Sequence, residues 1–472
     1  TGALTHPGWR AELMEKLVPA DSAGLFRLRP DLEQHYRKSL PGECFGATVH
    51  FVLSGEISSI YKKDGRVRKV HNLVLLPSFE AAERLSARLE QVGNIRSDGR
   101  PILGLDCREL LAMTLDIDPD ACFIPAHIWT PHFSVFGSRS GFDTLEHCYG
   151  DLAGQIYAVE TGLSSDPAMN WRISALDNLT LVSNSDAHSP EKLAREANLI
   201  DSDLSYQGLI GALKGNPGQK FLGTVEFYPQ EGKYHYDGHR ACNVRLTPEQ
   251  AAGLDGRCPA CGGKLTQGVL ARVGQLADRP DGARPGNAKD FQRLVPLSEV
   301  IAESLNVGAA TKKVLTQRDN LLRGVGSELH VLRTAPLDQV ARYSTELIAE
   351  AVRRNREGRV KIEPGYDGQY GKVKIFETGE RKTSCGQMIF FDSAEIDQSI
   401  PESVADPMEI LALQNEPTVD SPAIVTSPDA ETTSAINITG IELNRFQADA
   451  AGSEHTPLAI IAGPGTGKTR CL

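Results

Sequence analysis

The sequence lacks the marks of a membrane protein or a secreted protein. It contains no apolar run of 18 residues, so we expect no segment to span a membrane. No signal peptide is visible, and the nine cysteines do not form the paired framework of a disulfide-stabilised secreted chain. These absences favour a protein of the reducing cytoplasm.

Basic residues are absent from one long segment. Residues 392–435 contain ten Asp or Glu and no Lys or Arg, whereas the whole chain has a net charge of −11. The rest of the chain is therefore nearly neutral, at about −1. A neutral protein still binds nucleic acid where its basic residues cluster, so the overall charge does not exclude DNA as a partner.

An initiator methionine is also absent. The sequence begins at Thr1 and ends at Leu472, shortly after a phosphate-binding loop, so we expect it to be a fragment of a longer protein. Its 472 residues, 40% of them apolar, predict two to four globular domains with real cores.

The segment 183–189 carries the first candidate site residues. It follows residues 179–182, an apolar run with β-branched side chains that predicts a buried strand. Asp186 and His188 stand two positions apart, so in extended backbone both side chains leave the same face. A carboxylate and an imidazole at the end of a strand suit a metal ion, although an isolated Asp-x-His is more often a turn with a surface histidine.

Further strand-like runs, separated by stretches of helical spacing such as residues 79–92, predict an α/β fold with a parallel barrel or sheet. The runs are residues 47–53, 70–76, 121–127 and 156–160. In such folds the site lies at the carboxyl ends of the strands.

Four more candidate ligands lie in or near the ends of apolar runs, namely His6, Glu56, His71 and His127. Any single histidine among them is more often a hydrogen-bonded core or rim residue than a metal ligand. Their shared placement favours a cluster that holds two or three ions of Zn²⁺, Mn²⁺ or Fe²⁺. Paired metals lower the pKa of a bound water and stabilise both oxygens of a phosphodiester.

The short sequence segments around these residues resemble the successive motifs of the PHP (polymerase and histidinol phosphatase) phosphoesterases. The motifs are Thr5-His6-Pro7, Gly55-Glu56, Val70-His71, Pro125-Ala126-His127 and Ser185-Asp186-Ala187-His188. Longer segments, including Glu160-Thr161-Gly162-Leu163-Ser164-Ser165-Asp166-Pro167 and residues 233–240, resemble the endonuclease Q family over about residues 1–376.

This resemblance implies a PHP-type (β/α) barrel over residues 1–230 that lacks its first strand, followed by a zinc-binding segment. It implies cleavage of DNA on the 5′ side of deaminated bases and abasic sites. It also implies that Zn, Mn or Mg is held by His6, Glu56, His71, His127, Asp186 and His188, with Glu56, Asp186 and His188 as the catalytic residues. Ser164, Ser165 and Asn184 are near enough in sequence to contact the substrate, without an assigned role.

Two departures from the family pattern weaken the expected metal site. The family's first motif, a His-x-His, is absent because it would precede Thr1, and Ala3 stands where members usually carry an acid. A metal position without these ligands is under-coordinated. We therefore expect this polypeptide to be impaired or inactive as a nuclease.

Residues 231–275 contain a second group of metal ligands. His239-x2-Cys242 is followed by Cys258-x2-Cys261, and Pro259 and Gly262-Gly263 favour a tight turn. Two ligand pairs separated by about fifteen residues predict a structural zinc site. The histidine that completes it stays open, because His235 is nearby.

Residues 290–376 are predicted to be largely helical and are a candidate DNA-binding region. Basic side chains gather at Lys312-Lys313, Arg318 and Arg323, and again at 353–359. They suit phosphate contacts or an ordinary solvated helix face equally well. Tyr366 and Tyr370 follow in a glycine-rich turn, where base stacking is an alternative to simple packing.

The last two predicted units are an acidic, disordered linker at 380–437 and the start of an ATP-binding domain at 438–472. An apolar run, 458–461, leads into Ala462-Gly463-Pro464-Gly465-Thr466-Gly467-Lys468-Thr469, a phosphate-binding loop in which Lys468 reaches the β/γ-phosphates and Thr469 ligates Mg²⁺. Together with the sequence segment around Gln447, this loop resembles the start of the RecA-like domain of UvrD/Rep-type superfamily 1 DNA helicases. No later helicase motif follows, so we expect weak ATP binding and no hydrolysis.

The sequence thus predicts a DNA-repair endonuclease with PHP metals, a zinc knuckle and a fused ATP-dependent helicase, whose partners are DNA and ATP. Two alternatives stay open. One is a PHP phosphatase of a small phosphate ester, and the other is a DNA-lesion-binding module without catalysis.

Overall fold

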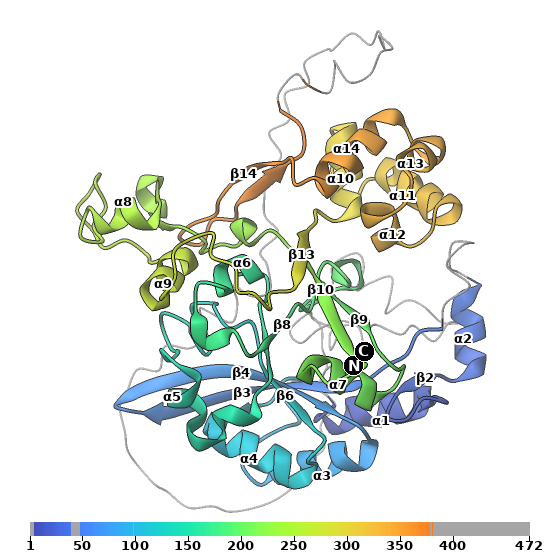
Figure 1. Cartoon of the computed structure of the whole chain (residues 1–472), viewed down its shortest axis with the longest axis vertical. Coiled ribbons are helices and arrows are strands. Elements are labelled where there is room, and N and C mark those ends of the chain that lie inside the picture. Colours follow the sequence, from blue (N-terminus) through green and yellow to red (C-terminus); the bar gives the residue numbers. More distant parts are fainter. Residues whose placement is uncertain (1–3, 39–47, 98, 378–379, 381–472) are drawn as a thin grey trace, which may run out of the picture. The chain divides into compact units, whose positions relative to one another are not determined.

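The computed structural model describes residues 4–38, 48–97, 99–377 and 380 (Figure 1). The described residues group into two compact units: 187–191 belong to the second, and the others belong to the first. The predicted linker, apart from residue 380, and the predicted phosphate-binding loop lie outside the described residues. Among the described residues, no helix is long and apolar enough to cross a membrane.

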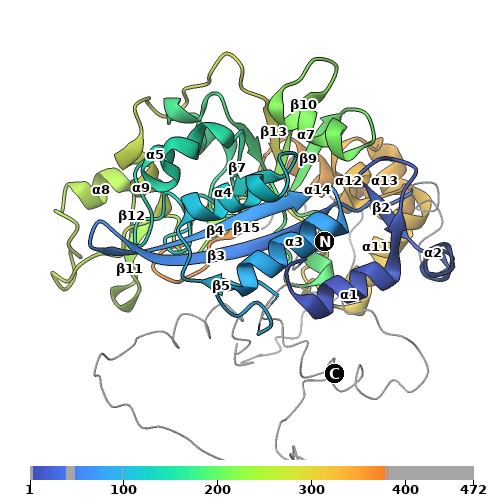
Figure 2. The same ribbon diagram turned by 90° about the horizontal axis from the view of Figure 1, so that it is seen from below.

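A long β-hairpin organises the N-terminal part of the first unit (Figure 2). Strands β3 (Leu53–Lys63) and β4 (Arg66–Leu76) are antiparallel and are joined by Asp64 and Gly65, which have φ of 52° and 72°. Two residues in the left-handed region form the tight turn that matches the twist of paired strands. The prediction of an all-parallel arrangement is therefore wrong here, because a two-residue connection can join only antiparallel strands.

The hairpin belongs to a four-stranded sheet of order β5-β3-β4-β6, in which β5 is Ile102–Leu103 and β6 is Cys122–Pro125. Only β3 and β5 run parallel, and β4 is antiparallel to β6. The predicted strand at 47–53 is also misplaced: Phe51 forms an isolated bridge with Phe26, and the strand begins at Leu53. Apolar composition alone did not reveal that the strand continues through polar but buried residues such as Ser58.

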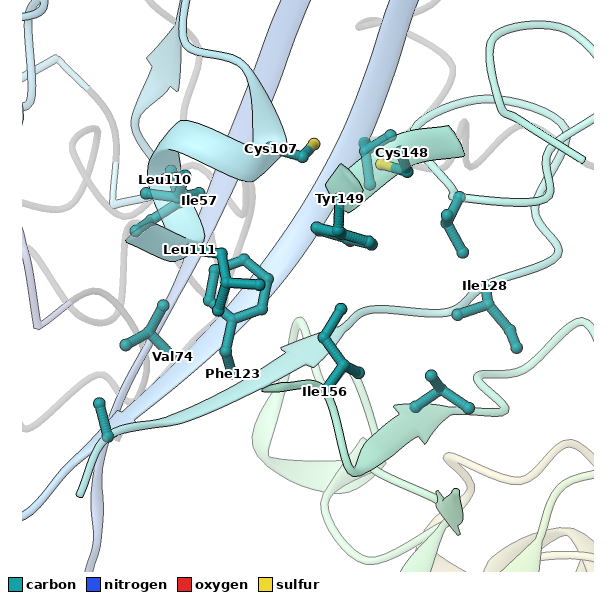
Figure 3. Close-up of a cluster of buried hydrophobic side chains, with 14 of the residues drawn as sticks. Ile57, Val74, Cys107, Leu110, Leu111, Phe123, Ile128, Cys148, Tyr149 and Ile156 are labelled. Atoms are coloured by element: carbon teal, nitrogen blue, oxygen red, sulfur yellow. The ribbon is translucent and has the colours of Figure 1, made fainter. Parts of the chain in front are cut away.

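The sheet separates two apolar cores because side chains alternate between its faces. Ile57, Val74 and Phe123 pack on one face with helices α3 (Phe79–Glu90) and α4 (Cys107–Ile117) (Figure 3). Leu73, from the same strand as Val74, faces a second core. Each fully buried side chain of this kind stabilises the fold by about 1.5–3 kcal/mol. Helix α3 confirms the predicted helix at 79–92, and Ser78 caps it by accepting the N–H of Ala81.

The other strands of this region form smaller sheets. They pair as β1 (Leu17–Pro19) with β2 (Phe26–Leu28), as β7 (Ala158–Glu160) with β8 (Thr180–Val182), and as β9 (Ala197–Asp201) and β13 (Asp290–Arg293) on either side of β10 (Lys220–Glu226). Strands β7 and β8 are parallel and confirm the predicted strands at 156–160 and 179–182. The other helices up to residue 276 are α1 (Pro7–Lys16), α2 (Pro30–Arg37), α5 (Leu145–Tyr149), α6 (Pro167–Asn170), α7 (Tyr206–Lys214), α8 (Pro248–Ala252) and α9 (Val269–Leu276).

The predicted helical region has its own buried core. It consists of α10 (Leu297–Leu305), α11 (Lys312–Gly324), α12 (Glu328–Arg333), α13 (Leu337–Tyr343) and α14 (Glu346–Arg356), and is followed by the hairpin of β14 (Lys361–Glu363) and β15 (Lys372–Lys374).

Several arginines of α14 have partners within the protein. Arg353 and Arg354 both pair with Glu350, whose pKa their hydrogen bonds lower to about 2. Arg356 donates to the backbone carbonyls of Val331, Leu332 and Ala335. The Glu350 pairs lie within α14, whereas Arg356 links α14 to α12 and the residues after it.

Candidate functional site

Glu56 and His71 meet on one face of the β3–β4 hairpin. In the strand register Ser58 is opposite His71 and Leu73 is opposite Glu56, so Glu56 and His71 are diagonal neighbours on the same face. The Nδ1 atom of His71 lies 2.6 Å from Oε1 of Glu56. Both residues lie well inside their strands, not at strand ends as the sequence suggested.

His127 joins this pair from the turn after β6. Its Nε2 atom is 3.1 Å from Nδ1 of His71 and 3.6 Å from Oε1 of Glu56. Its other ring nitrogen, Nδ1, lies 3.1 Å from the hydroxyl of Ser134 and 3.2 Å from that of Thr130. These hydroxyls orient the ring so that Nε2 faces the carboxylate.

The backbone of His127 is held in an unusual conformation. Its φ of 30° lies in the left-handed region that few non-glycine residues adopt. The carboxylate of Glu160 accepts the His127 N–H at 2.7 Å. On another side, a Cβ added to Gly162 would lie 2.5 Å from Cβ of His127, so only glycine allows this close approach.

The electrostatics of the cluster favour one carboxylate anion beside imidazoles. Burial raises the pKa of Glu56, but His71, His127 and Arg100 outweigh this and hold that pKa well below its ordinary value. Burial lowers the pKa of His127, but hydrogen bonding and attraction to Glu56 outweigh it and raise the pKa to about 9. Burial lowers the pKa of His71 to about 4. A cation at this position is therefore balanced by the Glu56 carboxylate.

The other predicted ligands are placed differently. His6 caps helix α1, where Nδ1 accepts the N–H of Trp9, and its Nε2 lies 2.9 Å from the carbonyl oxygen of Arg96. Asp186 is exposed with φ of 42°, and its charge acts on His127 and Glu160 and raises both pKa values. His188 belongs to the second compact unit, whereas Glu56, His71 and His127 belong to the first.

The sequence interpretation assigned no role to Glu160 or to the buried polar residues around it. Glu160 ends β7 and is only 3% exposed, and burial raises its pKa to about 7. Thr161 donates to the buried carboxylate of Glu226 in β10, whose pKa burial raises to about 8. Two sequence features marked Glu160: it directly follows the apolar run 156–159, and it begins the segment 160–167 that resembles the endonuclease Q family.

The donor set of the cluster fits a divalent metal ion. The ligand atoms of Glu56, His71 and His127 all lie within 4.8 Å of one another. One carboxylate oxygen and two imidazole nitrogens are suitable ligands for Zn²⁺ or Mn²⁺. In addition, Nε2 of His71 is buried without a hydrogen-bond partner among the described residues. The site could therefore hold a metal, with three protein ligands from three different strands or turns.

A second group of ligand atoms comes from the end of β11 (Asp237–His239), the turn before β12 (Val244–Leu246) and the turn at residues 258–261. The ligand atoms of His239, Cys242, Cys258 and Cys261 lie within 4.8 Å of one another, and Sγ of Cys261 is 3.4 Å from Nδ1 of His239. Burial raises the pKa of Cys258, but backbone N–H groups of residues 260 and 261 outweigh it and lower the pKa to about 7. This arrangement could hold a tetrahedral zinc ion.

His235, the other histidine considered for this site, is buried elsewhere. It is 3% exposed, its ring stacks on Tyr236 at 5.4 Å, and its Nδ1 has no hydrogen-bond partner among the described residues. It is not part of the cysteine cluster. Burial lowers the pKa of His235 to about 4.

Two curated proteins have similar sequences. The chain is 31% identical over 286 residues to the uncharacterized protein MJ0043 of Methanocaldococcus jannaschii, which covers 58% of this chain and 35% of MJ0043. It is 30% identical over 311 residues to the uncharacterized protein YqxK of Bacillus subtilis, which covers 65% of this chain and 74% of YqxK. Residues 296–359 match the family model of the MJ0043 C-terminal domain. The chain thus spans about a third of MJ0043.

Two crystal structures share this mixed α/β fold. The lesion-specific endonuclease PfuEndoQ of Pyrococcus furiosus has a TM-score of 0.68 and 30% identity, over 82% of this chain and 90% of the other. A complex of endonuclease Q with a 27-mer duplex substrate, with an abasic lesion at the active site, has a TM-score of 0.67 and 31% identity, over 81% and 88% of the two chains.

The buried His235 gives the protein a measurable pH dependence. Its pKa of about 4 in the folded state is below the unfolded value of about 6.5. Between these values the unfolded chain binds more protons, so the free energy of unfolding falls as the pH falls below 6.5. Between pH 7 and pH 5, we expect the free energy of unfolding to fall by about 2 kcal/mol more in the wild type than in His235→Phe, as measured by urea denaturation.

Exposed His35 supplies the control, because His35→Phe should keep the wild-type dependence. Equal losses of stability in the wild type and His235→Phe would contradict the buried neutral state of His235.

Proposed function

We propose that this chain, which belongs to the family of YqxK of Bacillus subtilis and has a fold similar to that of PfuEndoQ of Pyrococcus furiosus, is a metal-dependent DNA-repair nuclease. The observation that carries the proposal is the convergence of Glu56, His71 and His127 in a fold that resembles a lesion-specific endonuclease. Its substrate is DNA that contains a deaminated base or an abasic site. The scissile bond is the phosphodiester on the 5′ side of the lesion.

Glu56, His71 and His127 hold the metal in this proposal, and the resemblance to the PHP motifs adds Asp186, His188 and His6 as proposed ligands. Glu56, Asp186 and His188 are the proposed catalytic residues. A bound divalent ion, Zn, Mn or Mg, would supply a water of lowered pKa and stabilise charge on the phosphate. Thr130 and Ser134 orient the His127 ring, and the buried surroundings of Glu56 strengthen its attraction to a cation.

The nuclease proposal is tested with the whole chain, Mn²⁺ or Mg²⁺, and duplex DNA that carries one uracil, one hypoxanthine or one abasic site. Because the chain departs from the family's ligand pattern, we expect only a slow nick on the 5′ side of the lesion, and at least a 100-fold slower nick with Glu56→Gln, because that change removes the anion of the cluster. Products are sized on a denaturing gel. Exposed Glu83, on the outer face of α3, provides the control substitution Glu83→Gln.

Two results would contradict the proposal and favour its alternatives. Hydrolysis of p-nitrophenyl phosphate without any nick in lesion DNA would favour a phosphatase. Tight binding of lesion DNA without cleavage, unchanged in Glu56→Gln, would favour a binding module.

We also propose that His239, Cys242, Cys258 and Cys261 hold a structural zinc ion, as their proximity suggests. Purified wild type should contain about one tightly held zinc that Cys261→Ala loses and Glu56→Gln keeps, as measured by mass spectrometry of metals. Zinc that is absent from the wild type, or unchanged by Cys261→Ala, would exclude this site.

The ATP-binding unit rests on sequence alone, since Gln447 and the loop Gly463, Gly465, Thr466, Gly467, Lys468 and Thr469 lie outside the described residues. We propose that they begin a UvrD-like helicase domain that uses ATP-Mg, within a cytoplasmic protein. A fluorescent ATP analogue should bind weakly and in a Mg²⁺-dependent way, at least tenfold more weakly to Lys468→Ala than to the control Lys372→Ala. Equal affinities would refute the assignment.

A further inference from the structure

Glu160 connects the two turns that carry His127 and Asp186. Its Oε2 atom accepts the backbone N–H of His127 at 2.7 Å, and its Oε1 atom accepts Nδ2 of Asn184 at 2.7 Å. Asn184 stands two residues before Asp186. Each carboxylate oxygen thus binds one of the two turns, from a residue that is 3% exposed at the end of β7.

Both turns contain a strained ligand residue. His127 has φ of 30° and Asp186 has φ of 42°, and neither is a glycine. Such conformations persist only when the surrounding structure imposes them, and they concentrate at functional sites. In the turn that carries His127, the left-handed conformation is imposed by the hydrogen bond from His127 to Glu160 and by the close contact with Gly162.

The second turn is held by a chain of amide groups. Asn184 Oδ1 accepts Nδ2 of Asn198 at 3.0 Å, which leaves the Asn184 NH2 group to face Glu160. Asn198 in turn accepts the N–H of Ser183 and donates to its carbonyl, at 2.8 and 2.9 Å. The position of this turn relative to His127 therefore depends on the Glu160 carboxylate.

The chemistry of these contacts requires a carboxylate. Glu160 faces two N–H donors, one at each carboxyl oxygen, and a carboxylate offers an acceptor on both oxygens. A glutamine would present an NH2 group to one donor, and one buried group would lose its partner.

We propose that Glu160 is a positioning residue that sets the spacing between His127 and Asp186 so that both can bind one metal site, without contacting the metal itself. This inference rests on the proposed nuclease site. Residues that orient metal ligands in this way commonly change metal affinity or activity by about 10–100-fold when they are replaced.

The test exchanges the two hydrogen-bonding groups in the whole chain. In Glu160→Gln the amide at position 160 faces the amide of Asn184, and in Asn184→Asp two carboxylates face each other. In the double variant, the amide oxygen at position 160 accepts the His127 N–H, and the amide NH2 group donates to the new carboxylate at position 184, which still accepts Nδ2 of Asn198. We expect the Mn²⁺ affinity of each single variant to be lower than that of the wild type by about 10-fold or more. In the double variant we expect the affinity to recover to within about threefold of the wild type.

Mn²⁺ affinity is measured by titration calorimetry and by the electron paramagnetic resonance of free Mn²⁺, without DNA. Thermal melting checks that each variant is folded, and Glu83→Gln is the control. The inference would be overturned if Glu160→Gln bound Mn²⁺ with wild-type affinity. It would also be overturned if the loss of Mn²⁺ affinity in the double variant equalled the two single losses combined.

The two proposals fail in different ways. If Mn²⁺ affinity follows the swap but lesion DNA is not cut, the positioning role stands and the nuclease assignment is wrong. If lesion DNA is cut and Glu160→Gln leaves Mn²⁺ affinity unchanged, the nuclease stands and Glu160 has no positioning role.

Discussion

The candidate metal centre depends first on the register of the β3–β4 hairpin. Glu56 and His71 are fifteen positions apart in the sequence, and they meet because Ser58 pairs with His71 across the hairpin. A slip of one residue would send one of the two side chains to the opposite face, into the core that contains Ile57 and Val74. The turn at Asp64 and Gly65 and the alternation of apolar side chains on both faces specify this register together.

Burial makes the surroundings of the centre sensitive to small changes. Glu160, Glu226 and Thr161 are nearly inaccessible to solvent, and each polar group is satisfied by a particular neighbour. In a low-dielectric interior such bonds are strong and an unpaired group is costly. A network of this kind orients ligands more rigidly than exposed loops could, at some cost in the stability of the isolated protein.

The region that matches the MJ0043 C-terminal domain shows how charge patterns mislead. In the sequence its arginine-rich end suited phosphate contacts and an ordinary solvated helix face equally well. In the structure Arg353 and Arg354 bind Glu350, and Arg356 satisfies backbone carbonyls of α12 and the residues after it. The Glu350 pairs follow helical spacing within α14, whereas the carbonyl partners of Arg356 come from tertiary neighbours, so composition alone does not distinguish a structural arginine from one that binds DNA.

The sequence by itself determined the elements with strong local patterns. The helix at 79–92, the strands that end at Glu160 and Val182, and the grouping of Cys242, Cys258 and Cys261 follow from short-range spacing, whereas the choice of His239 over His235 needed the structure. Only the tertiary structure decided which distant residues meet. It brought Glu56, His71 and His127 together, placed His6 at a helix cap, and gave Glu160 its two partners. The reason is physical: register, left-handed turns and buried hydrogen bonds join residues far apart in the chain, and local periodicity carries no record of those pairings.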